Sequence, residues 1–102
     1  MLDILDNSRQ AIAQACKRYG VARLDVFGSA LRGDFRLNGS DLDLLVEFGP
    51  MEPYARVDAY FGLREELRSL LGIEIDLVMV GAVKNPYIAS AIKRTRRILY
   101  AA

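Results

Sequence analysis

Two periodic patterns of apolar residues alternate along the chain. Helical spacing predicts helices at three places, residues 3–19 (or 8–19), residues 56–71, and the segment that follows the N-cap and first-turn pair Asn85-Pro86. Strand-like alternation predicts strands at 21–27, 41–48 and 73–80, with a short edge strand at 97–100. This order predicts an α/β (α+β) fold, in which helices cover one side of a small mixed sheet and the other side is open.

The apolar positions of each predicted helix define the side that should be buried. These positions are Leu5, Ile12, Cys16 and Tyr19, then Tyr60, Leu63, Leu67, Leu70 and Leu71, and finally Ile88, Ala91 and Ile92. Gly20 and Gly72 are predicted to end the first two helices, because glycine adopts the left-handed conformation without strain. Cys16 is interpreted as a core residue, with a reactive thiol as the minor alternative.

Composition restricts the class of protein. The 102 residues are enough for one domain, residues 1–102, and the hydrophobic fraction of 52% predicts a folded core. The 14 basic and 13 acidic residues nearly balance, so net charge gives no attraction to nucleic acid. No apolar run predicts a membrane span and no secretory signal is recognised, so a cytoplasmic location is expected. With no histidine and one cysteine, the chain excludes Ser-His-Asp triads, Cys-His pairs and an internal disulfide.

Three aspartates carry the candidate chemistry. Asp41 and Asp43 are two residues apart on a predicted strand, so their side chains should lie on one face while the apolar residues take the other. Asp76 is similarly placed between apolar residues of a later strand, and Glu74, nearer the strand end, is the competing candidate. If these strands are neighbours the three aspartates converge. A mutually repelling cluster of hard oxygen ligands of this kind predicts a Mg²⁺ site.

A Gly28-Ser29 pair at the end of the first predicted strand is the second candidate feature. Glycine lets the backbone approach a phosphate closely, and Ser29 supplies a backbone N–H and a hydroxyl as donors. Arg32 either contacts phosphates or makes a structural ion pair, two interpretations of similar weight. Phosphate, Mg²⁺ and three acids together predict phosphoryl or nucleotidyl transfer.

These motifs resemble the minimal nucleotidyltransferases, the MNT group of the DNA polymerase beta superfamily. The resemblance extends over nearly the whole chain and is carried by residues 27–34, 40–48, 63–67, 75–78, 84–88 and 98–100. It implies that Gly28 and Ser29 hold the triphosphate of ATP and that Asp41 and Asp43 bind two Mg²⁺ ions. It also implies that Asp76 completes the catalytic metal site and helps to activate the attacking hydroxyl, with pyrophosphate as the leaving group.

The resemblance also implies a partner. Many MNT proteins are antitoxins that add AMP to a tyrosine of an all-α HEPN ribonuclease toxin. Because the chain ends about where the catalytic core ends, the acceptor is expected on another protein, a cognate HEPN toxin. The leading hypothesis is therefore an Mg²⁺-dependent protein adenylyltransferase that acts as an antitoxin. Two alternatives stay open, namely nucleotidyl transfer to a small molecule such as an aminoglycoside, and a non-catalytic antitoxin that neutralises by binding alone.

A basic cluster lies near the C-terminus and comprises Lys93, Arg94, Arg96 and Arg97. The first interpretation is a solvated helix end, where the helix dipole favours cations. Contact with an acidic partner ranks second and contact with RNA third.

Overall fold

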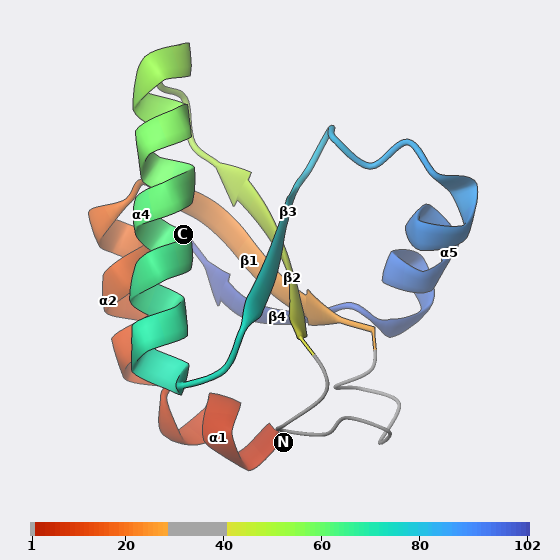
Figure 1. Cartoon of the computed structure of the whole chain (residues 1–102), viewed down its shortest axis with the longest axis horizontal. Helices are drawn as coiled ribbons and strands as arrows, with labels where there is room; N and C mark the ends of the chain where they lie inside the picture. Colours follow the sequence, from red (N-terminus) through yellow and green to blue (C-terminus); the bar gives the residue numbers. More distant parts are fainter. Residues whose placement is uncertain (1, 29–40) are drawn as a thin grey trace.

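The computed structural model describes residues 2–28 and 41–102. Between these ranges the sequence predicts a short helical turn at 30–32 and a loop at 33–40, and both lie outside the described residues. Figure 1 shows helices packed against a small sheet. The elements are α1 (Leu2–Asn7), α2 (Arg9–Arg18), β1 (Val21–Phe27), β2 (Leu42–Phe48), α4 (Pro53–Leu71), β3 (Ile75–Met79), α5 (Pro86–Thr95) and β4 (Arg97–Ala101). Within the described residues, no helix has the length and apolar character that crossing a membrane requires.

The four strands form one mixed sheet in the order β3-β2-β1-β4. β1 is antiparallel to both β2 and β4, whereas β2 and β3 are parallel. The parallel pair is possible because α4 carries the chain back across the sheet between the two strands, as parallel pairing requires. The predicted mixed sheet flanked by helices is confirmed, and so is the edge strand near the C-terminus.

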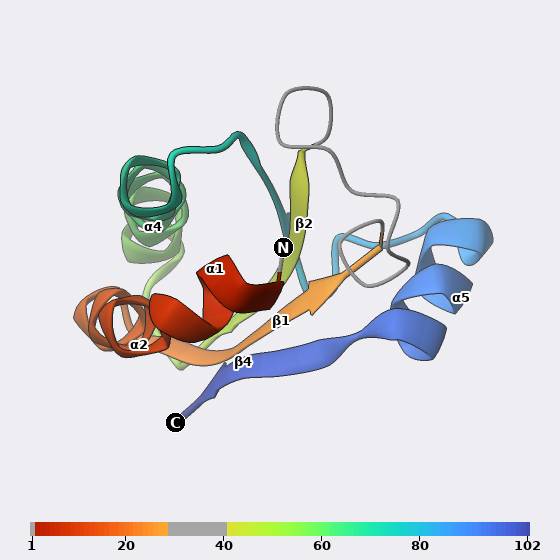
Figure 2. The ribbon, with the colours of Figure 1, turned by 90° about the horizontal axis from the view of Figure 1, so that it is seen from below.

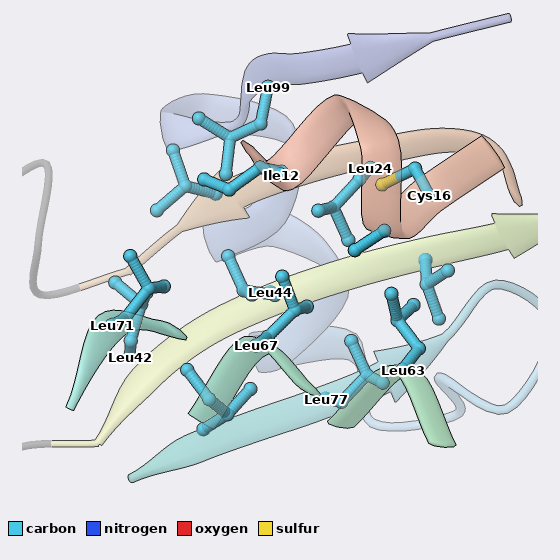
Figure 3. Packing of buried hydrophobic residues seen from close by; sticks show 14 of the residues in the cluster. Ile12, Cys16, Leu24, Leu42, Leu44, Leu63, Leu67, Leu71, Leu77 and Leu99 are labelled. Atoms are coloured by element: carbon cyan, nitrogen blue, oxygen red, sulfur yellow. The ribbon is translucent and has the colours of Figure 1, made fainter. Parts of the chain in front are cut away.

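The main core lies between one face of the sheet and the helices α2 and α4. Leu42, Leu44 and Val46 of β2 are completely buried on this face, as period-two alternation predicts. Figure 3 shows how Leu42 and Leu44 pack together with residues of the helices and the other strands. The labelled side chains of this cluster are Ile12, Cys16, Leu24, Leu42, Leu44, Leu63, Leu67, Leu71, Leu77 and Leu99.

The second face of the sheet is not fully open, which corrects the prediction that all helices lie on one side. Ile92 of α5 packs against Phe27 of β1 and Leu45 of β2 in a small separate cluster. Figure 2 shows α5 at the opposite end of the sheet from α2 and α4. Ile88 is 45% exposed, so the prediction that it points inward is wrong, because α5 contacts the sheet mainly through its last turn.

Several element boundaries differ from the sequence-based predictions. The first predicted helix is two helices that break at Ser8, and α4 begins at Pro53 rather than at residue 56, since proline is well suited to the first helical turn. Gly20 and Gly72 adopt φ values of 71° and 69° and end their helices as predicted. The Asn85 side chain caps α5 by accepting from the backbone N–H of Tyr87 at 2.8 Å.

Cys16 is fully buried, which confirms its interpretation as a core residue. Burial raises the pKa of its thiol from the ordinary 9.0 to about 12. We therefore expect a thiol reagent to label native Cys16 very slowly at neutral pH and to label the unfolded chain quickly. The raised pKa of the folded-state thiol also affects stability. Its contribution to the free energy of unfolding is fully present below about pH 9 and is lost as the pH rises toward 12, because the unfolded chain ionises its thiol first. Fast labelling of the native protein would restore the reactive-thiol alternative.

Candidate active site

The strand register brings two of the three predicted aspartates together. In the parallel ladder between β2 and β3, Asp43 lies directly opposite Asp76. Neighbouring strands are separated by about 4.8 Å, so these carboxylates are side by side. Both side chains project from the face opposite the main core. Their sequence neighbours Leu42, Leu44 and Leu77 are buried in that core, and successive residues of a strand point to opposite faces. The expected adjacency of the two acid-bearing strands is therefore observed.

Asp41 lies at the margin of this pair. It precedes the first residue of β2 and is exposed, whereas the strand was predicted to include it. The ladder begins one residue later, where the backbone N–H of Leu42 donates to the carbonyl of Glu74 at 2.9 Å. Asp41 is thus close to the start of both strands, outside the regular pairing that aligns Asp43 with Asp76.

Glu74 was the competing candidate for the third acid, and its side chain is engaged elsewhere. Its carboxylate accepts a hydrogen bond from Nε of Arg68 on α4 at 3.0 Å, and it precedes β3. The hydrogen bond to Glu74 raises the pKa of the Arg68 guanidinium above its usual value. The register opposite Asp43 therefore favours Asp76 over Glu74 as the partner acid.

Gly28 brings the end of β1 against the Asp43 carboxylate. It is buried, and its φ of 78° lies in the left-handed region that favours glycine. A Cβ at this position would overlap Oδ2 of Asp43 and lie 3.3 Å from its Cγ. The structure thus shows a close approach of Gly28 to the Asp43 carboxylate, and the predicted approach of this backbone to a phosphate stays a prediction. Ser29 and Arg32, the other predicted phosphate ligands, lie outside the described residues.

The Gly28 N–H is held by a residue that the sequence analysis did not single out. It donates to Oγ1 of Thr95, at the end of α5, at 3.1 Å. The Thr95 hydroxyl in turn donates to the carbonyl of Ala91 at 2.7 Å. No local sequence signal marks this contact, because Thr95 is far from Gly28 along the chain.

A buried ion-pair network lies on the same face of the sheet. Asp25 of β1 is completely buried, and its carboxylate accepts from Nε of Arg23 at 3.0 Å and from Nε of Arg96 at 2.6 Å. Arg96 therefore is not part of a solvated helix end, which corrects the first interpretation of the basic cluster for that residue. An aspartate inside a predicted strand was the signal available, because aspartate is disfavoured there unless it has a specific partner.

A groove of about 580 Å³ lies beside α5 on this face of the sheet. Its lining includes Leu45, which follows Asp43 by two residues on the same side of β2, together with Val83 and Ile92. Lys93 and Arg96 add positive charge to this otherwise mostly apolar lining.

The donor set is suited to Mg²⁺ when phosphate oxygens complete the coordination. Among residues 2–28 and 41–102, no group of three or more acids, histidines or cysteines is gathered closely enough to surround one ion. The register supplies two carboxylates, those of Asp43 and Asp76, and Asp41 is nearby but outside the ladder. Mg²⁺ is usually held by one or two protein carboxylates plus waters and substrate phosphates, so this pair fits that mode of binding.

Comparisons with known proteins agree with this chemistry. Residues 8–99 match the family model described as a nucleotidyltransferase domain. A Methanocaldococcus jannaschii protein, provisionally named a protein adenylyltransferase, is 38% identical over 89% of this chain and 86% of its own length. The protein adenylyltransferase MntA of Thermococcus cleftensis is 39% identical over 68% of this chain and 66% of its own.

Solved structures give the same fold. One, provisionally described as a minimal nucleotidyltransferase, has a TM-score of 0.76 and 33% identity, covering 94% of this chain and 93% of its own. An MNT antitoxin, in complex with a tri-AMPylated HEPN toxin of Shewanella oneidensis, has a TM-score of 0.64 and 17% identity, covering 96% of this chain and 73% of its own. At that lower identity the likeness establishes the fold alone.

Proposed function

The chain belongs to the nucleotidyltransferase domain family, and we propose that it is a Mg²⁺-dependent protein adenylyltransferase with an antitoxin role. It transfers AMP from ATP to a hydroxyl, that of a tyrosine, on a cognate HEPN toxin. The observation that carries the proposal is the alignment of Asp43 with Asp76 beside the Gly28 turn. Support for the acceptor class comes from the relatives named as protein adenylyltransferases and from the AMPylated toxin complex that shares the fold.

The proposed reaction is a substitution at the α-phosphorus of ATP. The acceptor oxygen forms the new bond to phosphorus, the bond from phosphorus to the bridging oxygen breaks, and pyrophosphate leaves. The acceptor hydroxyl gives its proton to the Asp76 carboxylate. Asp76 is exposed and Asp43 is half-buried, so a hydroxyl arriving from solvent reaches Asp76 first.

Asp41, Asp43 and Asp76 would hold two Mg²⁺ ions together with the triphosphate. When bound, the metal stabilises charge on the attacking and leaving oxygens. The chain itself positions the site, because Gly28 keeps the end of β1 against Asp43 and the β2–β3 ladder fixes the spacing of Asp43 and Asp76. Ser29 and Arg32 are the proposed contacts to the phosphates.

The decisive experiment combines the chain, α-labelled ATP, Mg²⁺ and the protein encoded by the adjacent gene. We expect the partner to gain the mass of one or a few AMP groups, with peptide mapping locating them on a tyrosine. EDTA should abolish the transfer, because the paired carboxylates would then repel the triphosphate. A partner that binds without gaining mass would favour the binding-only antitoxin. Labelling of an added aminoglycoside instead of the partner would favour the small-molecule enzyme.

A further inference from the structure

We propose that Thr95, at the end of α5, is a positioning residue for the nucleotide site, holding the Gly28 turn in place against Asp43. This inference rests on the proposed function. Thr95 is outside the candidate acids and phosphate ligands, and its effect is transmitted through the Gly28 backbone.

The hydrogen bonds of Thr95 define its role. A threonine hydroxyl has one donor hydrogen, and here it is directed to the carbonyl of Ala91 at 2.7 Å. The oxygen can therefore act only as an acceptor toward the backbone N–H of Gly28, at 3.1 Å. The orientation of the hydroxyl is fixed within its own helix, so α5 presents a fixed acceptor to the end of β1.

The Gly28 turn needs such an anchor for two reasons. Gly28 is buried, and a buried backbone N–H without a partner is costly. The turn also approaches the Asp43 carboxylate so closely that a Cβ would not fit between them. A small displacement of Gly28 would therefore change the space around the acid that is proposed to hold the metal.

The end of α5 is itself fixed to β1. The residue after Thr95 is Arg96, which binds the completely buried carboxylate of Asp25 on β1. One turn earlier, Ile92 packs on Phe27, the residue before Gly28. Thr95 thus lies between an apolar contact and an ion pair to the same strand, and these contacts hold its hydroxyl at a constant distance from the turn.

One consequence concerns the phosphate ligands. The Gly28 N–H already donates to Thr95, so it is not a donor to the phosphates. Gly28 serves the site by having no side chain, which leaves space beside Asp43. The donors proposed for the phosphates belong to Ser29, which is bonded directly to Gly28. Thr95 therefore fixes the point from which the phosphate-binding segment begins.

The test compares Thr95→Val with Thr95→Ser. Valine keeps the shape and β-branching but removes the acceptor, whereas serine keeps the hydroxyl and removes only the methyl group. We expect Thr95→Val to lower kcat/KM for ATP in AMP transfer by about 5- to 100-fold, the scale of leaving a buried donor unsatisfied. Affinity for the partner protein should stay unchanged, and Thr95→Ser should recover most of the activity. Assays are run well below the melting temperature of each variant.

The pair of variants separates positioning from simple packing. If Thr95 only fills space, Thr95→Val should keep the activity of AMP transfer and Thr95→Ser should lower it. This result would overturn the proposal. Equal activity of Thr95→Val and wild type would also overturn it. If the wild-type chain transfers no AMP at all, the proposed function fails. The role of Thr95 is then tested by Mg²⁺·ATP affinity and by hydrogen exchange of the Gly28 amide. The Thr95→Val variant must bind Mg²⁺·ATP more weakly than Thr95→Ser, and its Gly28 amide must exchange faster.

Discussion

Replacing Asp76 by asparagine is expected to lower AMP transfer by about 10²–10⁴-fold, the scale of losing a positioned acid–base group. Asparagine keeps the size of the side chain but loses the charge that binds metal and accepts a proton. Asp43, directly opposite, and Asp41 keep their charges, so some Mg²⁺·ATP binding should remain. Asp76 is exposed, so the fold and the contact with the partner should persist. The measurement is the mass added to the partner by variant and wild type.

Glu74→Gln is the matched control for Asp76→Asn. It removes the same charge from an acid two residues earlier, and its carboxylate binds Arg68 on α4 rather than facing Asp43. We expect this variant to retain transfer and to lose only the weak contribution of an exposed ion pair. If Glu74→Gln were the inactive variant, the choice of Asp76 as the third acid would be wrong.

The Asp76→Asn variant also tests the antitoxin role in cells, by comparison with the wild-type chain. Cells that express the toxin together with the Asp76→Asn chain should stop growing, although the two proteins still co-purify. The toxin from these cells should lack the added AMP that the wild-type chain leaves on it. Normal growth with Asp76→Asn would show that binding alone neutralises the toxin, and the catalytic proposal would then take second place.

The sequence predicted well those features that depend on local pattern. Alternation along β2 and β3 placed Asp43 and Asp76 on the face away from the core, and the parallel register then aligned them. Gly72 and Asn85 marked helix ends for reasons contained within a few residues, left-handed backbone and side-chain capping. The position of Asp41 was less well predicted, because the end of a strand depends on where its partner begins to pair.

Features that join distant segments were not predictable in this way. Asp25 is marked only as an aspartate inside a predicted strand, and the sequence does not show that one of its partners would be Arg96, at the end of α5. Thr95 binds Gly28 for the same tertiary reason. Ile88 was expected inward by helical period, but α5 reaches the sheet mainly through Ile92. In each case packing between segments decided the outcome, which no local period encodes.

The two faces of the sheet carry different kinds of residue. The face toward α2 and α4 holds the main apolar core, and the other face holds Asp43, Asp76 and the buried carboxylate of Asp25. Because successive residues of a strand point to opposite sides, a substitution on the acid face changes the site while leaving the core intact. A variant at the exposed Asp76 is therefore informative about chemistry rather than about folding.

Gly28→Ala should combine a loss of stability with a loss of transfer. At a φ of 78° any Cβ is strained by about 1–2 kcal/mol. In addition, the new Cβ overlaps Oδ2 of Asp43, so either the turn or the carboxylate must move. We expect AMP transfer to fall by about 10²-fold, the scale of a 1 Å displacement in an active site. Thermal unfolding and transfer to the partner are measured on the same preparation.

Gly72→Ala separates the two effects of Gly28→Ala. Gly72 has a nearly equal φ of 69°, but nothing lies within 4 Å of the position of its Cβ. This variant should therefore show the backbone strain alone, with a lowered melting temperature and full activity. The difference in transfer between the two variants then reports the crowding of Asp43 by a single methyl group. If both variants were equally active at a temperature where both are folded, Asp43 would not need the space that Gly28 leaves, and the proposed role of this glycine would have to be abandoned.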